Sequence, residues 1–123
     1  MIKKTLPLIV VMLFVLTSCT KNNPEAVTVR FYDALQRSAF SEALTYTNVP
    51  AENVEQTAII VEKMGMHIQD YEVVSVEKEE GDTTASVVVH NRVTFDGVAD
   101  TVEASPEIRC AKIDGQWKVV FFM

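Results

Sequence analysis

Apolar residues recur at helical spacing along the first half of the chain after residue 23. Asn23-Pro24-Glu25 has the composition of a helix start: a capping Asn, Pro at the first helical position and an acid in the first turn. The pattern predicts three helices: one over about Pro24–Arg37, a short one capped by Ser41 and ending near Asn48, and a third in the segment that Pro50 starts, marked by Val54, Ala58, Val61 and Met64 and capped by Gly65.

After Ile68 the apolar period changes from helical spacing to every second residue, which is typical of half-buried strands. Asp96-Gly97 and Asp114-Gly115 are two-residue hairpin signals. The pattern predicts four strands: Glu72–Glu80, Thr84–Phe95, Val98–Ile113 with a bend at Pro106, and Gln116–Met123.

The two hairpin turns predict which strand residues face each other. They pair Asn91 with Val102, Val89 with Ala104, and Cys110 with Val119, and alternation then places these pairs on one face. That face is apolar, and the helices are expected to cover it: Val87, Val89, Val93, Val102, Ala104, Ile108, Cys110, Trp117, Val119 and Phe121. The opposite face is polar, with His90 opposite Glu103 as a surface pair. The result is an α+β domain over residues 24–123, with helices first and then an antiparallel meander.

The first nineteen residues have the three parts of a bacterial export signal. Lys3-Lys4 is followed by the uncharged run Leu6–Leu16, and then by Leu16-Thr17-Ser18-Cys19, which resembles a lipobox. The resemblance implies a signal peptide over 1–18, lipid on Cys19 and a short tether over 19–23. A membrane-spanning helix is the alternative, but Leu6–Leu16 is shorter than the roughly 20 apolar residues that one needs.

Charge and cysteine content limit the partners of the mature domain. Loss of Met1–Ser18 removes Lys3 and Lys4 and no acid, so the formal charge goes from −6 to −8. An acidic domain without a basic stripe is not expected to bind nucleic acid or to lie on anionic lipid. With Cys19 lipidated, Cys110 is left alone and no intrachain disulfide forms. We expect a protein of the bacterial cell envelope, anchored by lipid in a membrane, the outer membrane being the first candidate, with its domain outside the cytoplasm.

The order of elements resembles the nuclear transport factor 2-like (cystatin-like) superfamily. The resemblance is carried by Val29–Gln36 and Phe40–Leu44, which look like its first two helices, and by Asp114–Val119 at the end of the sheet. It implies N-terminal helices packed on a curved antiparallel sheet of about four strands, which together form a cone. More narrowly, the chain is similar to small bacterial lipoproteins that carry such a domain without an assigned function.

The superfamily includes ketosteroid isomerases and polyketide cyclases, so the resemblance also raises the question of catalysis. In the isomerases a Tyr on the first helix stabilises the oxyanion, and an Asp after the second helix is the base. Here Phe31 stands where the Tyr is expected, and Asn48 lies near the position of the Asp. Phe has no hydrogen-bond donor, and Asn does not accept a proton as a carboxylate does.

Candidate functional residues are therefore those that would line the cavity of the cone: Phe31, Tyr32, Tyr46, Met64, His67, Cys110 and Phe121. His67 and Asp70, in a predicted loop, form either an acid–base pair or two solvated side chains. No metal site or cofactor is expected. We expect a non-catalytic, lipid-anchored envelope protein whose domain binds a small apolar ligand, a peptide or a protein partner. The alternative is a small isomerase, cyclase or hydrolase acting inside the cone.

Overall fold

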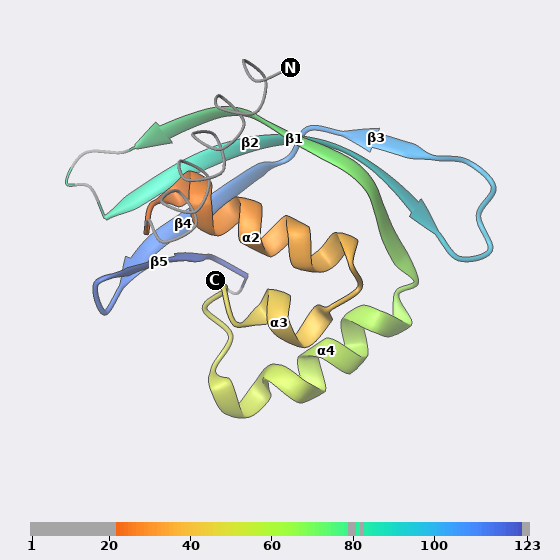
Figure 1. The fold of residues 1–123 in the computed structure, drawn as a ribbon, viewed down its shortest axis with the longest axis horizontal. Helices are drawn as coiled ribbons and strands as arrows, with labels where there is room; N and C mark the ends of the chain where they lie inside the picture. Colours follow the sequence, from red (N-terminus) through yellow and green to blue (C-terminus); the bar gives the residue numbers. More distant parts are fainter. Residues whose placement is uncertain (1–21, 79–80, 82, 122–123) are drawn as a thin grey trace, which may run out of the picture.

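The chain folds as three helices on one side of a curved antiparallel sheet (Figure 1). The computed structural model describes residues 22–78, 81 and 83–121. The predicted signal segment and Cys19 lie outside these residues, as do strand ends predicted at Glu80 and Met123. The α+β architecture predicted from the sequence is confirmed. No helix in the described part of the chain is long and apolar enough to cross a bilayer.

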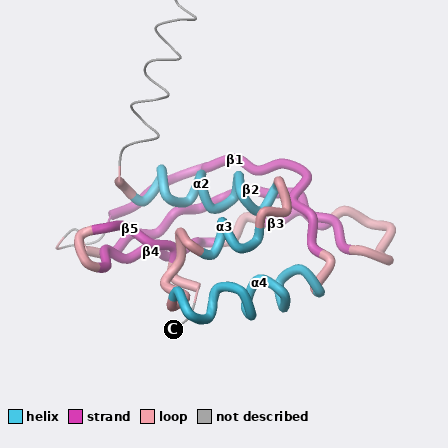
Figure 2. The backbone as a smooth tube through the Cα atoms, turned by 60° about the horizontal axis from the view of Figure 1, so that its bottom comes forward, coloured by secondary structure: helices cyan, strands magenta, loops and turns pink. Residues whose placement is uncertain are grey.

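The helices come first along the chain and the strands follow. They are α2 (Pro24–Gln36), α3 (Phe40–Leu44), the 3-10 turn η1 (Ala51–Asn53), α4 (Val54–Lys63), β1 (Met66–Lys78), β2 (Thr84–Phe95), β3 (Val102–Ala104), β4 (Glu107–Ile113) and β5 (Gln116–Val119). The strand order is β1-β2-β4-β5, and the short β3 pairs with β2 as well. Of the helices, α2 lies nearest the sheet and α4 farthest from it (Figure 2).

The predicted first helix is present, with its start as expected and its end one residue earlier, at Gln36. The side-chain Oδ1 of Asn23 accepts a hydrogen bond from the Ala26 amide at 2.7 Å, which satisfies one of the free N–H groups of the first turn. Apolar residues at helical spacing, among them Val27 and Leu35, are buried on one face. Burial of this stripe against the sheet is what holds α2 in place.

The second helix differs from its prediction at both ends. It begins at Phe40, with Ala39 rather than Ser41 as its N-cap, because the Phe40 ring packs against both apolar clusters of the molecule. It ends at Leu44 instead of near Asn48, because the chain leaves the helix and Thr47 forms a parallel bridge with Val119.

The third helix, α4, ends as predicted. Lys63 is its last residue, and Gly65 follows in the left-handed region with φ +67°. Glycine adopts this conformation without the steric cost that a Cβ brings. The chain can therefore turn directly from α4 into β1.

Strand β1 begins at Met66, six residues before the predicted start at Glu72. It pairs with β2 over its whole length, from Met66 opposite Phe95 to Lys78 opposite Ala85. Two register shifts, between Ile68 and Asp70 and between Val73 and Ser75, interrupt the alternation of side chains. Because of these shifts, apolar residues do not recur at every second position along β1, so the sequence pattern does not reveal where the strand begins. Such bulges also bend a sheet.

The predicted strand Val98–Ile113 is wrong as a single element, because it is split into β3 and β4 on either side of Pro106. The predicted register of the first hairpin is also wrong: Asn91 faces Ala104, and Val93 faces Val102. The amide of Val98 does donate to the Phe95 carbonyl at 3.1 Å, but β3 begins only at Val102, so the connection is longer than two residues. The shift is by two positions, so each residue keeps its face.

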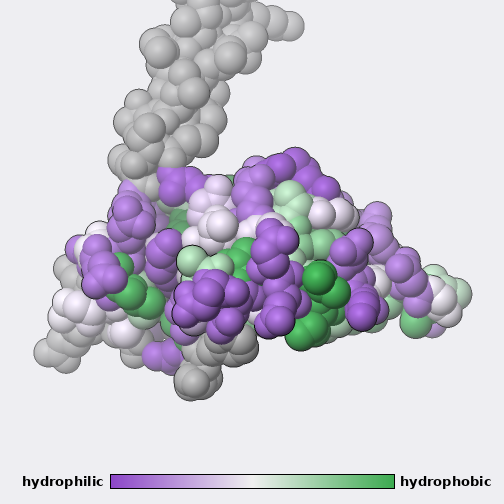
Figure 3. All heavy atoms as spheres, turned by 90° about the horizontal axis from the view of Figure 1, so that it is seen from below, coloured by the Kyte–Doolittle hydropathy of each residue, from purple (hydrophilic) through white to green (hydrophobic). Residues whose placement is uncertain are grey.

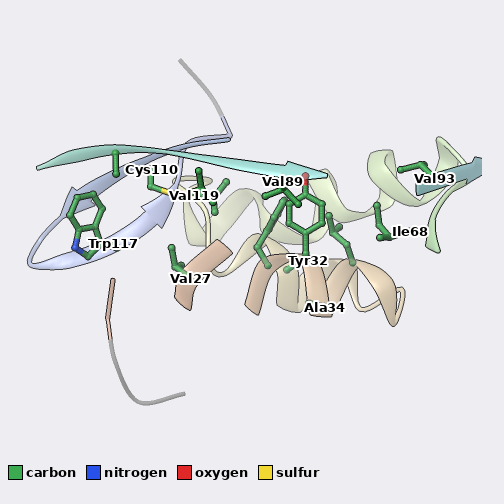
Figure 4. Close-up of a cluster of buried hydrophobic side chains, with 14 residues drawn as sticks. Val27, Tyr32, Ala34, Ile68, Val89, Val93, Cys110, Trp117 and Val119 are labelled. Atoms are coloured by element: carbon green, nitrogen blue, oxygen red, sulfur yellow. The ribbon is translucent and has the colours of Figure 1, made fainter. Parts of the chain in front are cut away.

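The second hairpin has the predicted register, with Cys110 opposite Val119 and Lys112 opposite Trp117. On this side of the sheet the inward residues are buried under α2, and Trp117 is only 4% exposed. Figure 4 shows Val27 and Tyr32 of α2 on the side facing the sheet residues. By contrast Val102, Ala104 and Phe121, predicted on the same covered face, are exposed because no helix packs directly on them.

Candidate functional site

An apolar cavity of about 370 Å³ lies where the helices and the sheet separate. α4 packs chiefly on α3 rather than on the sheet, which leaves space between α4 and the adjoining parts of β1, β2 and β3. This volume is within the range of small-molecule sites. The lining comes from α2, α3 and α4 with its C-cap, from β1, β2 and β3, and from two residues outside these elements: Phe31, Tyr32, Leu35, Phe40, Leu44, Val61, Met64, Met66, Ile68, Asn91, Val93, Phe95, Val102, Ala104, Pro106 and Phe121.

Two polar side chains, Tyr32 of α2 and Asn91 of β2, form the floor of this cavity. They are 5% and 4% exposed, and the Asn91 Nδ2 group donates a hydrogen bond to the Tyr32 hydroxyl at 3.3 Å. The Tyr32 ring is fixed by stacking on Tyr71, with ring centroids 5.3 Å apart, and by an edge contact with Phe31. The Tyr71 hydroxyl in turn donates to Asp33 Oδ1 at 3.0 Å.

The electrostatics of the floor favour neutral groups. Burial raises the pKa of the Tyr32 phenol, and the hydrogen bond from Asn91 only partly opposes this. Burial, followed by the hydrogen bond to Asp33 and its negative charge, raises the pKa of Tyr71 to about 12. No Asp, Glu, His, Lys or Arg is among the described residues that line the cavity. The interior is therefore apolar and uncharged at neutral pH.

The mouth of the cavity is apolar too, and it is open to solvent. Met64 is 57% exposed and Phe121 is 41% exposed, and Val102 lies with them among the exposed lining residues. Seen from the side of α4, polar residues cover most of the surface and apolar residues emerge in patches between them (Figure 3). Exposed apolar side chains beside a cavity are a common feature of ligand entrances.

The structure places the predicted cavity residues in two groups. Phe31, Tyr32, Met64 and Phe121 line the cavity. The other three, Tyr46, His67 and Cys110, do not line it. Tyr46 is half-buried and lies with Trp117 and Thr45 around a separate surface hollow.

His67 and Asp70 lie on β1 and not in a loop, which corrects the sequence prediction. His67 Nε2 is 2.8 Å from Asp96 Oδ1, and Asp70 accepts from the guanidinium of Arg92 at 3.2 Å. Along a strand, residues three apart are separated by about 10 Å. The two side chains therefore do not form a pair, and each belongs to an exposed surface interaction.

Cys110 is buried under the first turns of α2, away from the cavity. Its Sγ lies 3.4 Å from the Thr28 hydroxyl, and burial raises the pKa of the thiol, a shift that the Thr28 contact partly opposes. The hydrogen-bond contacts of its Sγ among the described residues are the Thr28 hydroxyl and the Pro24 carbonyl, and neither is a general base. A thiol held neutral in an apolar core is a poor nucleophile. His90 contacts Glu103 as predicted, at 3.3 Å, although the strand partner of Glu103 is Arg92.

Asn91 is the functional candidate that sequence reasoning missed. It stands between Val89 and Val93 on the inward face of β2, where every second residue is otherwise apolar. An amide at such a position indicates a buried polar contact, since an unpaired one would be costly. The sequence alone did not identify the Tyr32 hydroxyl as its partner.

No family model matches this chain, and no curated protein does. Solved structures do share its architecture. A domain of unknown function with a cystatin-like fold from Nostoc punctiforme is 16% identical, with 76% of this chain and 68% of that chain covered and a TM-score of 0.56. A ketosteroid isomerase-like protein from Erwinia carotovora is 14% identical, with 77% and 86% covered and a TM-score of 0.53.

A third similar chain, from Campylobacter jejuni, is described as an NTF2-like transpeptidase. It is 17% identical, with 81% of this chain and 99% of that chain covered and a TM-score of 0.50. Identities this low speak for the fold and not for activity. The chain therefore has the nuclear transport factor 2-like, or cystatin-like, fold.

Proposed function

We propose that this protein is a non-catalytic, lipid-anchored protein of the bacterial envelope whose domain binds a small apolar ligand. The observation that carries the proposal is the open cavity of about 370 Å³ with an uncharged, almost wholly apolar lining. A site of this kind gains binding energy from burial of hydrocarbon, at about 25 cal/mol per Å². The anchor is inferred from the sequence Leu16-Thr17-Ser18-Cys19.

Catalysis inside the cone is the alternative, and the lining residues favour binding over it. General acid–base chemistry needs a side chain that gains or loses a proton near the working pH and lies within hydrogen-bond reach of the substrate. Among the described residues that line the cavity, the titratable side chain is Tyr32, and burial raises its pKa further above neutrality. Asn48, near the position of the expected base, lies outside the cavity and accepts from the Phe121 amide at 2.7 Å.

A peptide or protein partner is the other alternative. It would use the outer side of α4, where Ile59 and Ile60 are exposed. Neither residue lines the cavity, so the two kinds of binding are separable by mutation.

The binding function is tested by filling the cavity. Ala104 lines the cavity and is exposed at its mouth, so Ala104→Phe places a ring in the ligand space without disturbing the α2 core. Ala99→Phe adds the same ring to an exposed loop and is the matched control. We expect the neutral dye Nile red to bind the mature chain without lipid, residues 20–123, and Ala99→Phe, and to bind Ala104→Phe at least about tenfold more weakly.

Equal dye binding by both variants would contradict the cavity as the site. In parallel, simple ketones and esters are screened for turnover. Turnover that disappears in Tyr32→Phe would favour the catalytic alternative.

The anchor is tested by Cys19→Ala in the full chain. We expect wild-type protein to sediment with membranes and the variant to be released, because the acylated Cys is the attachment point. A variant that remains in the membrane fraction would contradict lipid anchoring.

A further inference from the structure

The floor of the cavity has hydrogen-bonding capacity that the protein itself does not use. Among the described residues, the side-chain hydrogen bond of Asn91 and that of the Tyr32 hydroxyl are made with each other. Since Tyr32 accepts from Asn91, its own proton is available, and the amide carbonyl of Asn91 is a further acceptor. Both side chains are more than nine-tenths buried, and both line the cavity.

The same floor has nothing to compensate an ionised group. No charged side chain lines the cavity in the described part of the chain. Asp33, the carboxylate nearest to Tyr32 in sequence, is exposed, does not line the cavity, and accepts a hydrogen bond from the Tyr71 hydroxyl. An ion moved from water to such a floor would lose hydration without gaining a counter-charge, which is costly.

Polarity changes along the cavity in one direction. The floor carries the polar pair, and the mouth carries the exposed apolar side chains of Met64 and Val102. A ligand with a polar head would thus bind with the head inward, and its hydrocarbon would contact the walls and the mouth. An inverted ligand would leave both floor groups facing hydrocarbon.

We propose that the cavity takes an uncharged amphiphile, a hydrocarbon with one hydroxyl or carbonyl head, whose head bonds to Tyr32 and Asn91. This inference rests on the proposed binding function and adds the charge and orientation of the ligand. Fatty acids and alkylamines are disfavoured at neutral pH because their heads are ionised. Alcohols and ketones with either a ring or a chain as their hydrocarbon part can form these hydrogen bonds with Tyr32 and Asn91.

The first test compares two probes of equal chain length. Binding of decan-1-ol and of decanoate to the mature chain without lipid is measured by titration calorimetry at pH 8. We expect decan-1-ol to bind at least about tenfold more tightly, because decanoate must bury an unpaired charge. Decanoate affinity equal to or above that of decan-1-ol would overturn the inference.

The second test asks whether the polar head of the ligand contacts Tyr32 and Asn91. Tyr32→Phe is expected to weaken decan-1-ol binding about fivefold to tenfold, the scale of one net hydrogen bond. Tyr46→Phe removes the same atom from a tyrosine outside the cavity and should change nothing. Asn91→Leu is a second floor variant, in which the preference for decan-1-ol over decanoate should fall. Unchanged preference in both floor variants, each first shown to unfold cooperatively, would overturn the inference.

Failure of the inference and failure of the proposed function are distinguishable. If Nile red binds and decanoate competes with it as well as decan-1-ol does, the cavity binds ligands but the neutral-head inference is wrong. If neither dye nor decan-1-ol binds, both are wrong.

Discussion

The two halves of the sheet follow the same alternating pattern but are covered differently. In the half formed by β4, β5 and the start of β2, α2 packs directly on the inward residues, and Val87, Cys110 and Val119 are almost fully buried. In the half formed by the start of β1, the end of β2 and β3, the helix opposite is α4, which packs chiefly on α3. Inward residues there, such as Val102, line a cavity.

The comparison shows that an inward-facing apolar residue is not by itself a core residue. Alternation along a strand decides the face, and the distance of the covering helix decides whether that face becomes solid core or binding space. In this chain the first, covered half supplies most of the fully buried core. The second half supplies much of the cavity lining, although Ile68 and Val93 there are also buried in the core cluster.

The largest expected effect is in the covered half. Trp117→Ala removes a side chain that is 4% exposed and should lower the free energy of unfolding by about 3–5 kcal/mol. The matched aromatic change at the mouth of the cavity is Phe121→Ala, where the ring follows β5 and is 41% exposed, and the expected loss is under about 1 kcal/mol. Urea unfolding of residues 20–123 measures both, and similar losses would contradict the contrast between the covered core and the open cavity.

A smaller effect is expected at the junction between α4 and β1. Gly65→Ala should cost about 1–3 kcal/mol, because φ is +67° and a Cβ would lie 2.9 Å from Asp96 Oδ2. Gly97→Ala is the control: φ is +80° but the space is open, so a loss of about 1 kcal/mol is expected. Since Gly65 lies between two cavity residues, Met64 and Met66, its variant should also bind Nile red less well. Unfolding free energies that fall equally in both variants would argue against a close Gly65–Asp96 contact.

The smallest effect is expected where the two halves meet, at Tyr71. Its folded pKa of about 12 exceeds the reference value of 10.0, so its contribution to stability is complete below pH 10 and is lost as pH rises toward 12. Solvent screens this partly exposed group, so the contribution is under about 1 kcal/mol. Tyr71→Phe should flatten the fall in unfolding free energy between pH 10 and 12. A profile as steep as that of the wild type would contradict the assignment.

Local signals in the sequence were enough for the elements that local chemistry determines. Asn23-Pro24 gave the start of α2, and Asp114-Gly115 gave the register of β4 and β5. Both depend on interactions between residues close in sequence, such as a capping bond or a two-residue turn.

The features that sequence reasoning missed depend on tertiary packing. The first hairpin is longer than its turn signal indicates, and the bulges in β1 hide its first residues from a period-two pattern. The cavity exists because α4 packs on α3, and no residue of α4 signals that distance. The pairing of Asn91 with Tyr32 joins positions 59 residues apart, which only the folded chain brings together.

At Asn22, the first residue that the structure describes, the side-chain Oδ1 accepts a hydrogen bond from the Trp117 amide of β5 at 2.6 Å. With lipid on Cys19, only Thr20 and Lys21 would separate the lipidated residue from Asn22, which is three Cα–Cα steps and a reach of about 10 Å. The domain would then stay close to the membrane that holds its lipid and could not move a bound ligand across the envelope. A ligand would therefore have to reach the surface of that membrane, or be produced there, before the domain could bind it.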